Sequence, residues 1–551
     1  MTEKSGAEVL VKSLEAQGVK YIFGIPGAKV DKVFDALTDS SIELVVCRHE
    51  QNAVFIAGGW GRMTGEAGVC LVTSGPGCTN LATGLVTATY EGDPVVALGG
   101  LVPVSQRLKL THQTLDTTAF FKPITKYSVE INSSEAIGES IANAFRAAES
   151  GRPGGVFVGL PQDVMVGPCS AEVLTPVPPQ RLGAGDPEAI AEAARRINAA
   201  EGPVLFLGML ASQPGSAMAI RHLLDQTPIP VVSTFQGTGI VPKERLEWFA
   251  GRVGLFRNQP ADELLGNSDC VIAIGYDQVE YDPALWNAGQ KREIIHIDAV
   301  LADIDKDYRP TVEITGEIAD AVAELGKHLK LSPSAAGQKL IRHARLKLEE
   351  IRAQWAGNSG MPVHPLRLIH DLQSVLTDDT TLLVDMGSVH LWHGHYLYSF
   401  QPRQMLITNG QQTLGVALPW AIAACLARPK HKVISVSGDG GFLFSAMELE
   451  TAVRLKCNFV HLIWTDGTYN MIAEQELLKY GRVSGCTIGA IDVPGYAEAF
   501  GAKGFKIAHP DEFLPTLRKA MEISGPVLIE IPVDYSHNSE LYKNVLIDIL
   551  H

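Results

Sequence analysis

Two acidic turns in the last third of the chain have the residue types of a site for a metal ion and an anion. Asp439 stands in Gly438-Asp439-Gly440-Gly441, and Asp466 is followed by Gly467. Carboxylate oxygens are ligands that Mg²⁺ prefers in proteins, and Mg²⁺ commonly shares the oxygens of a bound phosphate. Glycines let backbone N–H groups approach such an anion closely. The two turns together therefore predict a site for Mg²⁺ and a diphosphate.

The elements around these turns would bring them to one place. The β-branched run Val433–Val436 predicts a strand before the first turn, an amphipathic helix follows, and the apolar run Phe459–Trp464 predicts a second strand. A strand, a crossover helix and a second strand make parallel strands, whose carboxyl ends meet at one sheet edge. The glycines would lie at the N-terminus of the helix, where partial positive charge favours an anion. An isolated acidic glycine turn usually only ends a strand, and the second acidic turn favours the functional interpretation.

The same stretch resembles the thiamine diphosphate motif of the pyruvate decarboxylase and acetohydroxyacid synthase superfamily. In that motif a Gly-Asp-Gly turn is followed, after a helix and a strand, by an acidic or amide residue. The resemblance implies that Asp439, Asp466 and the carbonyl of Thr468 bind Mg²⁺. Many relatives have two asparagines where this chain has Asp466-Gly467, and an aspartate is at least as good an oxygen ligand.

Length and charge bound the kind of protein. The 551 residues leave room for about three or four domains. Lysine and arginine total 46 against 61 aspartates and glutamates, a net charge of −15, and nucleic acid binding needs a basic face. The longest apolar runs are only as long as strands, and the N-terminus fits neither a signal nor a transit peptide. No nucleic acid partner and no membrane span are therefore expected.

The cysteines indicate the compartment. All eight are scattered without CxxC spacing, and most fall in apolar strands or helices, where cysteine is usually a small buried hydrophobe. Neither a disulfide framework nor a zinc site is expected, and this predicts a reducing, cytoplasmic location.

Strands and helices alternate along the chain, which predicts an α/β fold with open, doubly wound parallel sheets. We expect three such domains, at residues 1–170, 186–331 and 362–551, with the proline-rich stretch Pro161–Pro179 as a linker after the first. A charged helix, Gly337–Trp355, would link the second and third. By resemblance, the first domain binds the cofactor's pyrimidine, the second is a central Rossmann-like domain, and the third binds diphosphate and Mg²⁺.

Glu50 follows the predicted strand Ile42–Cys47 and precedes a helix. A glutamate in the first turn of a helix is usually explained by the helix dipole alone. Its position, together with the later loop Ser74–Asn80, matches the pyrimidine-binding domain of the superfamily. The resemblance implies that Glu50 hydrogen-bonds N1′ of the aminopyrimidine, so that the imino form of the ring can act as a base on the thiazolium C2–H.

The central domain departs from flavin-binding relatives. Acetohydroxyacid synthases that bind FAD have a conspicuous Arg-Phe-Asp-Asp-Arg stretch, and here the equivalent place after Ile274-Gly275 is Tyr276–Pro283. In this respect the chain resembles the catabolic acetolactate synthases, which do not use flavin. No FAD is therefore expected.

In the third domain, the resemblance assigns further residues to the cofactor. Gly387 and Ser388 would lie near the phosphates, and the Gln412 carbonyl and Leu414 amide would bond the pyrimidine edge. Leu414 would separate the two rings so that the cofactor is bent, which brings the imino nitrogen close to C2. The full set of expected cofactor-binding residues is Glu50, Pro76, Asn80, Gly387, Ser388, Gln412, Leu414, Gly438, Asp439, Gly440, Gly441, Asp466, Thr468 and Tyr469.

Three further residues are assigned to the substrate. Gln475 falls where branched-chain acetohydroxyacid synthases commonly have a tryptophan associated with 2-ketobutyrate as acceptor, so it indicates pyruvate as donor and acceptor. An exposed helical glutamine is usually only solvated. Gln113 matches a family glutamine near the reacting carbons and would orient the acceptor. Lys29 would neutralise carboxylates, or would simply be solvated on its loop.

The resemblance covers essentially the whole chain and implies a carboligase, a transferase of the acetoin and butanediol pathway. After decarboxylation of one pyruvate, a thiamine diphosphate enamine would attack a second pyruvate and give 2-acetolactate. Because Glu50 and the diphosphate site fall in separate domains, the family solution implies a homodimer with shared active sites, paired into a homotetramer. The alternatives are a biosynthetic acetohydroxyacid synthase that accepts 2-ketobutyrate, a 2-keto acid decarboxylase, a silent cofactor-binding homologue, and a flavin-binding redox protein.

Overall fold

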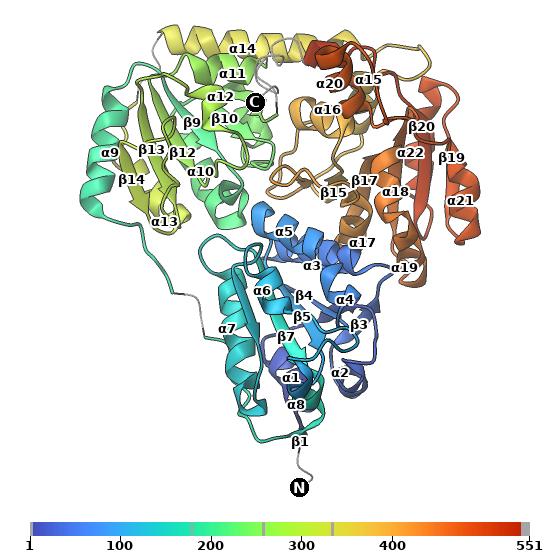
Figure 1. The fold of residues 1–551 in the computed structure, drawn as a ribbon. Coiled ribbons are helices and arrows are strands. Elements are labelled where there is room, and N and C mark those ends of the chain that lie inside the picture. Colours follow the sequence, from blue (N-terminus) through green and yellow to red (C-terminus); the bar gives the residue numbers. More distant parts are fainter. Residues whose placement is uncertain (1–3, 178–179, 256–258, 332–334, 542–551) are drawn as a thin grey trace. The chain divides into compact units, whose positions relative to one another are not determined.

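The computed structural model describes residues 4–177, 180–255, 259–331 and 335–541 (Figure 1). Within these residues the chain forms three six-stranded sheets, and every strand in them runs parallel to its neighbours. Apolar strands that are covered by helices on both faces make this arrangement, since parallel sheets need both faces buried. The predicted fold class, three open α/β sheets, is confirmed.

The first sheet has the order β3-β2-β4-β5-β7-β6. Its strands are β2 (Tyr21–Gly24), β3 (Glu43–Val46), β4 (Gly68–Val72), β5 (Val95–Leu101), β6 (Tyr127–Glu130) and β7 (Gly155–Pro161). Its helices are α1 (Gly6–Ala16), α2 (Asp31–Leu37), α3 (Glu50–Thr64), α4 (Pro76–Thr79), α5 (Ala82–Glu91), α6 (Thr117–Phe121), α7 (Ile137–Glu149) and α8 (Gln162–Val166).

The second sheet has the order β11-β10-β9-β12-β13-β14. Its strands are β9 (Pro203–Leu207), β10 (Val231–Thr234), β11 (Phe249–Val253), β12 (Cys270–Ile274), β13 (Glu293–Asp298) and β14 (Val312–Thr315). The helices of this part of the chain are α9 (Pro187–Ala199), α10 (Pro214–Gln226), α11 (Pro260–Gly266), α12 (Pro283–Trp286), α13 (Ile318–Gly326) and α14 (Ala335–Gln354).

The third sheet has the order β16-β15-β17-β18-β20-β19. Its strands are β15 (Thr380–Val384), β16 (Met405–Ile407), β17 (Lys432–Gly438), β18 (Phe459–Thr465), β19 (Lys503–Lys506) and β20 (Val527–Pro532). The helices are α15 (Pro365–Gln373), α16 (Ser388–Tyr396), α17 (Ala417–Ala427), α18 (Asp439–Ser445), α19 (Leu449–Arg454), α20 (Asn470–Tyr480), α21 (Val493–Ala499), α22 (Pro510–Ala520) and α23 (Asn538–Leu541).

The strand orders identify where each sheet can bind a ligand. In an open α/β sheet, ligands bind beyond the carboxyl ends of the two neighbouring strands from which the chain winds in opposite directions. These strands are β2 and β4 in the first sheet, β9 and β12 in the second, and β15 and β17 in the third. Numbered along the chain, the first and third sheets have the same strand order, and the second has the order of dinucleotide-binding folds.

Contacts divide the chain into two compact units. One comprises residues 1–180, 418–429 and 445–457, and the other comprises 181–417, 430–444 and 458–551. In the first unit, Gly59 of α3 faces Trp420 of α17, and a Cβ at Gly59 would approach the Trp420 ring to 2.7 Å. The small residue therefore allows α3 and α17 to pack closely.

Two local expectations differ from the structure. The stretch Pro161–Pro179 was expected to be a linker, but α8 follows its first residue and β8 (Pro168–Cys169) pairs antiparallel with β1 (Lys4–Ser5). Residues 178 and 179 of this stretch, and both outer ends of the predicted domains at 1–3 and 542–551, lie outside the described residues. The single helix expected after Gly441 is interrupted, because Ser445 leaves the helical conformation at φ −135° and its hydroxyl donates to Asn52.

No helix among the described residues is long and apolar enough to cross a membrane.

Candidate functional site

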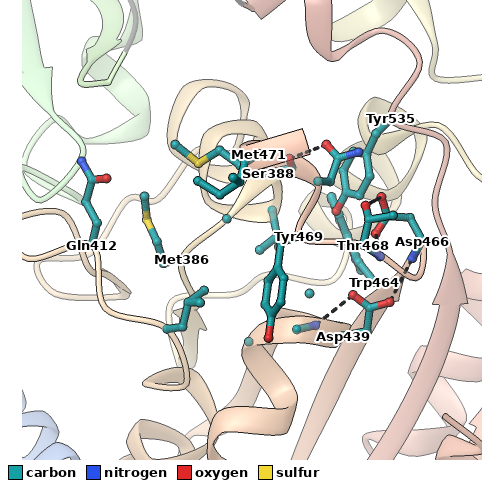
Figure 2. A pocket seen from close by; sticks show the side chains of 18 of the residues that line it. Met386, Ser388, Gln412, Asp439, Trp464, Asp466, Thr468, Tyr469, Met471 and Tyr535 are labelled. Atoms are coloured by element: carbon teal, nitrogen blue, oxygen red, sulfur yellow. Dashed lines mark hydrogen bonds between the residues drawn. The ribbon is translucent and has the colours of Figure 1, made fainter. Parts of the chain in front are cut away.

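A cavity of about 260 Å³ opens at the carboxyl ends of β15 and β17, where the third sheet is expected to bind a ligand. Figure 2 shows Asp439, Asp466 and Thr468 together on one side of this cavity and Gln412 on the opposite side. The predicted site residues that line it are Gly387, Ser388, Gln412, Leu414, Gly438, Asp439, Gly440, Gly441, Asp466, Thr468, Tyr469 and Gln475.

Asp439 ties the two acidic turns together. It is the first residue of α18, directly after β17, and only 5% of it is exposed. Its Oδ2 accepts hydrogen bonds from the backbone N–H groups of Asp466 at 3.2 Å and Gly467 at 2.8 Å, and its Oδ1 accepts from Gly440 at 2.9 Å. The carboxylate therefore fixes the end of β18 relative to the end of β17.

Asp466 is held by Thr468. The backbone N–H of Thr468 donates to Asp466 Oδ1 at 3.1 Å, and the threonine hydroxyl donates to Oδ2 at 2.7 Å. Burial raises the pKa of both Asp439 and Asp466, and the charge of Asp466 raises the pKa of Asp439 further. Two half-desolvated carboxylates that repel one another are stabilised by a cation between them.

The donor set fits Mg²⁺. No cluster of three histidine, cysteine, aspartate or glutamate side chains that could hold a metal occurs in the part of the chain that the structure describes. Zinc sites are usually built from such clusters, whereas Mg²⁺ is commonly bound by one or two carboxylates together with water and phosphate oxygens. Asp439, Asp466 and the carbonyl of Thr468 could hold Mg²⁺ in this way.

Glycines shape the anion-binding side of the cavity. A Cβ at Gly440 would lie 2.6 Å from the ring of Tyr469, so only glycine lets that ring lie over the start of α18. Gly387, just before α16, has φ +123° and ψ −165°, a conformation that residues with a side chain avoid. Both glycines therefore leave helix N-termini open to the cavity, where unpaired N–H groups attract an anion.

A buried aspartate fixes the loop that carries Leu414. The carboxylate of Asp385, at the end of β15, accepts from the backbone N–H groups of Gly415 at 2.8 Å and Ala417 at 3.1 Å. Burial raises the pKa of Asp385 to about 6. The neighbouring Gln412 has a left-handed backbone with φ +50°. Asp385 is thus a functional candidate that was not predicted from the sequence, because its partners Gly415 and Ala417 lie about thirty positions away.

Gln475 reaches the cavity from α20, together with Met471 and Ile472 of the same helix. Gln475 is half-buried, whereas Ile472 is 48% exposed. The side of the cavity formed by α20 is therefore mixed in polarity and open to solvent at its outer part.

The first unit gathers a second set of predicted residues. Glu50 is the first residue of α3, whose N-cap is His49, and the amide of Asn80 donates to Glu50 Oε2 at 2.9 Å. Pro76 begins α4 between them, and a Cβ at Gly77 would lie 3.7 Å from Glu50 Oε1. The loop after β4 therefore lies against the Glu50 carboxylate.

Gln113 joins this group, and Lys29 does not. Gln113 has φ +63°, and its Oε1 accepts from the hydroxyl of Ser74 at 2.6 Å. Lys29 is half-buried on the loop after β2, where its Nζ donates to Gln162 Oε1 at 3.1 Å. Among the hydrogen bonds and ion pairs of the described residues, Lys29 is joined to Gln162 rather than to Glu50 or Gln113.

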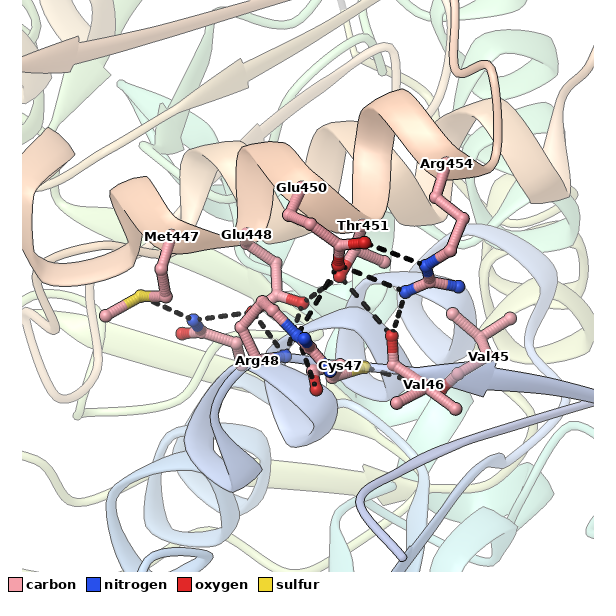
Figure 3. A network of polar contacts seen from close by, with 10 residues as sticks. Val45, Val46, Cys47, Arg48, Met447, Glu448, Glu450, Thr451 and Arg454 are labelled. Carbon is pink, nitrogen blue, oxygen red and sulfur yellow. Dashed lines mark hydrogen bonds and ion pairs between the residues drawn. The ribbon is translucent and has the colours of Figure 1, made fainter. Parts of the chain in front are cut away.

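A buried glutamate holds the start of the helix that carries Glu50. Glu448 is fully buried, and its carboxylate accepts from Arg48 N at 3.0 Å, Asn52 Nδ2 at 2.9 Å and Thr451 Oγ1 at 2.7 Å (Figure 3). Arg48 and Asn52 flank Glu50 in sequence. No local motif marks Glu448, because its partners Arg48 and Asn52 are about four hundred positions away in the chain, and it was not predicted from the sequence.

The binding edge of the second sheet is filled by a side chain of its own. Glu280 is 2% exposed beyond β9 and β12, and its carboxylate accepts from Met209 N at 3.0 Å, Asp277 N at 3.1 Å and Thr234 Oγ1 at 2.6 Å. A Cβ at Gly208 would lie 2.6 Å from Glu280 Oε2. The carboxyl group thus accepts hydrogen bonds from backbone N–H groups at the position where sheets of this strand order bind the phosphate of a dinucleotide.

Comparisons with known families match all three parts of the chain. Residues 4–120 match the N-terminal TPP binding domain of thiamine pyrophosphate enzymes, residues 190–325 match their central domain, and residues 385–531 match their C-terminal TPP binding domain.

Individual relatives are similar over nearly the full length. The chain is 50% identical to the catabolic acetolactate synthase of Raoultella terrigena over 97% of this chain and 96% of that protein. It is 47% identical to the acetolactate synthase of Bacillus subtilis (strain 168) over 99% and 96%, respectively. A probable acetolactate synthase large subunit of Methanocaldococcus jannaschii is 34% identical over 96% of this chain and 92% of that protein.

The Glu448 network leads to a prediction about the start of α3. Glu448→Ala should leave buried donors without an acceptor, at a cost of about 1–3 kcal/mol for each, and so loosen the first turn of the helix. Hydrogen exchange of the backbone amides at 48–54 should become faster, and the Tm should fall by several degrees.

The matched control is Glu450→Ala. Glu450 lies two residues away on α19, and its side chain is 35% exposed in ion pairs with Arg48 and Arg454. Exposed pairs of this kind contribute about 0–1 kcal/mol. Equal exchange at 48–54 in both variants would contradict the role of Glu448.

Proposed function

The chain belongs to the acetolactate synthase family of thiamine pyrophosphate enzymes, and we propose that it condenses two molecules of pyruvate to 2-acetolactate with release of CO₂. The observation that carries this proposal is the cavity at β15 and β17, whose paired carboxylates and open helix N-termini fit a metal-bound diphosphate. Full-length similarity to acetolactate synthases supports the choice of substrate and product. The protein is then a transferase that acts as a carboligase.

Thiamine diphosphate, when bound, supplies a nucleophilic carbon and an electron sink for decarboxylation. The match to both TPP binding domains supports this cofactor. Asp439, Asp466 and the carbonyl of Thr468 would bind Mg²⁺, which in turn would bind the diphosphate. The raised pKa values of the two aspartates support a cation there, because bound Mg²⁺ removes their repulsion.

The glycine turns and helix starts would bind the diphosphate itself. Gly441 at the start of α18, and Gly387 and Ser388 at the start of α16, line the cavity with backbone N–H groups. Gly440 lines it too, with its own N–H bound to Asp439 Oδ1. Gly438 and Tyr469 complete the lining on that side. Leu414 and Gln412, on the loop fixed by Asp385, would contact the rings and hold the cofactor bent.

Glu50 would act on the pyrimidine. Its carboxyl group would hydrogen-bond N1′ and so move a proton onto or off the ring. The Asn80 amide bound to Oε2 and the α4 loop beginning at Pro76 support a fixed orientation of this carboxyl group. Gln113, oriented by Ser74, would position the acceptor pyruvate, and Gln475 would favour pyruvate over the larger 2-ketobutyrate.

Lys29 is proposed to neutralise substrate carboxylates from its place on the loop after β2. Its present partner is the neutral Gln162, which leaves its charge uncompensated there.

Assembly and location complete the proposal. The three domains are 1–170, 186–331 and 362–551, and Glu50 and Asp439 fall in different ones, which supports a homodimer with shared sites, paired into a homotetramer. All eight cysteines are free thiols, which supports a reducing cytoplasm. An acidic chain with a net charge of −15 supports the absence of nucleic acid partners.

The central domain would work without FAD. Glu280 already engages the backbone N–H groups of Met209 and Asp277 where a dinucleotide phosphate would bind, so these donors are not open to a phosphate. This packing supports the flavin-independent type of acetolactate synthase over a flavin-binding redox protein.

The product identifies the reaction. Incubated with pyruvate, Mg²⁺ and thiamine diphosphate but no FAD, the purified protein should form 2-acetolactate, and it should prefer pyruvate when 2-ketobutyrate is also present. Acetaldehyde as the main product would instead indicate a 2-keto acid decarboxylase.

Glu50→Gln should slow turnover by at least about 100-fold, because general acid–base catalysis contributes that much. Unchanged exchange of the cofactor C2 proton in Glu50→Gln would refute the role of Glu50.

Sharing of the sites can be tested with two inactive variants. Asp466→Ala should bind Mg²⁺ much more weakly, whereas Asp466→Asn should be milder because it keeps one oxygen ligand. When Asp466→Ala and Glu50→Gln are mixed, dissociated and reassembled, half of the randomly paired dimers contain one chain of each variant. Each of these mixed dimers has one intact shared site of its two, so roughly a quarter of the activity should be recovered. No recovery in verified mixed dimers would place both residues in the site of one chain.

Glu280 should make stability depend on pH. Burial raises its pKa from 4.5 to about 8, despite three hydrogen bonds that favour the ionised form. Because the folded state binds this proton more tightly than the unfolded state, protonation of Glu280 stabilises the fold. This contribution is complete below about pH 4.5 and is lost as the pH rises through about 8. Glu280→Gln removes this titration, so the Tm of the variant should fall less than that of the wild type between these values.

Glutamine fits the site, because its amide oxygen can accept from Met209 and Asp277 while its NH₂ group faces the Thr234 hydroxyl. The control is Glu247→Gln, whose side chain is 57% exposed. Parallel pH profiles in Glu280→Gln and the wild type would contradict this prediction. A flavin absorption band in either purified protein would overturn the flavin-independent proposal.

A further inference from the structure

A fully buried asparagine near the C-terminal end of the described chain joins two helix starts of the cavity. Asn538 is the first residue of α23 and is 0% exposed. Its Nδ2 donates to Ser388 Oγ at 3.0 Å and to Asn470 Oδ1 at 2.6 Å. Ser388 is the first residue of α16 and Asn470 is the first residue of α20. One amide group therefore connects the two elements on which the cavity depends.

The network around Asn538 is complete. Trp392 Nε1, on α16, donates to Asn538 Oδ1 at 2.7 Å, which fixes the orientation of the amide. The hydroxyl of Ser388 donates to Asn470 Oδ1 at 2.8 Å. Both hydrogens and the oxygen of the Asn538 amide thus have partners, as a buried amide requires.

These hydrogen bonds determine which groups of Ser388 are available to bind an anion. Its hydroxyl hydrogen is directed to Asn470, and its Oγ accepts from Asn538, so the hydroxyl is engaged on the protein side. In the first turn of α16 the backbone N–H of His390 donates to the Gly387 carbonyl at 3.0 Å, whereas a helix leaves the N–H groups of its first two residues, here Ser388 and Val389, without an intrahelical acceptor. The start of α16 therefore offers its backbone to the cavity, and Asn538 sets its position.

The chain just before Asn538 also contributes to the cavity. Tyr535 is one of its lining residues (Figure 2). Asn538 follows three residues after Tyr535, and its side chain contacts the first residues of α16 and α20. Nothing in the sequence motif around Asp439 and Asp466 indicates this segment.

We propose that Asn538 is a positioning residue for cofactor binding, which holds the starts of α16 and α20 at the spacing that a diphosphate needs. This inference rests on the proposed function, because it takes the cavity to bind thiamine diphosphate. Asn538 acts through Ser388 and Asn470 and does not touch the reacting atoms. Without it, two helix starts with buried polar side chains must find other partners, and the cavity is less often in its binding geometry.

Binding of thiamine diphosphate to the apoprotein tests this directly. The Kd should be measured in the presence of Mg²⁺ by tryptophan fluorescence, since Trp464 lines the cavity. Asn538→Ala should raise the Kd by about 10- to 100-fold, the usual effect of losing a residue that orients a ligand-binding group. The fall in kcat at saturating cofactor should be smaller than the rise in Kd.

Two further variants separate positioning from general stability. Trp392→Phe removes only the donor that orients Asn538, so it should raise the Kd in the same direction by a smaller factor. Ser388→Ala combined with Asn538→Ala should raise the Kd by less than the product of the two single effects, because both belong to one network. Multiplicative effects would overturn the proposal.

The control is Ser539→Ala, at the next position of α23, which is exposed. It should leave the Kd for thiamine diphosphate unchanged. If Asn538→Ala lowers the Tm of the apoprotein and leaves the Kd as in this control, Asn538 is merely structural and the proposal is wrong. If the wild type itself does not bind thiamine diphosphate, it is the proposed function that fails.

Discussion

The site depends on the way one carboxylate joins the ends of two parallel strands. Asp439 follows β17, and its carboxylate accepts one hydrogen bond from the backbone N–H of Gly440 and two from backbone N–H groups in the turn after β18. These three hydrogen bonds set the geometry of both acidic turns. Because the carboxylate is nearly buried, these bonds are strong and their loss would be costly. The same bonds leave the carboxylates of Asp439 and Asp466 close together, and a cation bound between them would compensate for their charges. The two carboxylates that are proposed to bind Mg²⁺ are therefore placed by the same hydrogen bonds that set the geometry of the turns.

The three sheets use their binding edges differently. In the third sheet the edge remains open as a cavity, since Gly387 and Gly440 place backbone where side chains would otherwise stand. In the second sheet the equivalent donors are taken by Glu280, and the edge is closed. The chemical groups are the same in the two cases, a carboxylate and backbone N–H groups at the carboxyl ends of parallel strands. What differs is whether the backbone N–H groups are taken by a side chain of the protein or left open to a ligand.

Local patterns in the sequence predicted the features of the fold and site that depend on residues close together in the chain. The alternation of apolar strands with helices predicts the three parallel sheets, and the acidic glycine turns predict which strand ends form the cavity. Glu280 appeared only as part of a stretch that departs from flavin-binding relatives, and its burial depends on Thr234 and Met209, which are distant in sequence. The interruption of the helix at Ser445 was also hidden, because it depends on a hydrogen bond to Asn52.

The residues that position the site could not be predicted from local sequence patterns, whereas many of the residues that line it could. The residues proposed to bind Mg²⁺ follow strand ends directly, as Asp439 follows β17 and Asp466 follows β18, so their spacing is short and forms a motif. Glu448 and Asn538 instead satisfy buried polar groups on helix starts, and any element that passes nearby can supply such a partner. Their sequence positions are set by the path of the chain and not by the chemistry at the ligand. A buried polar side chain that bridges two helix starts is thus recognised only once the fold is known.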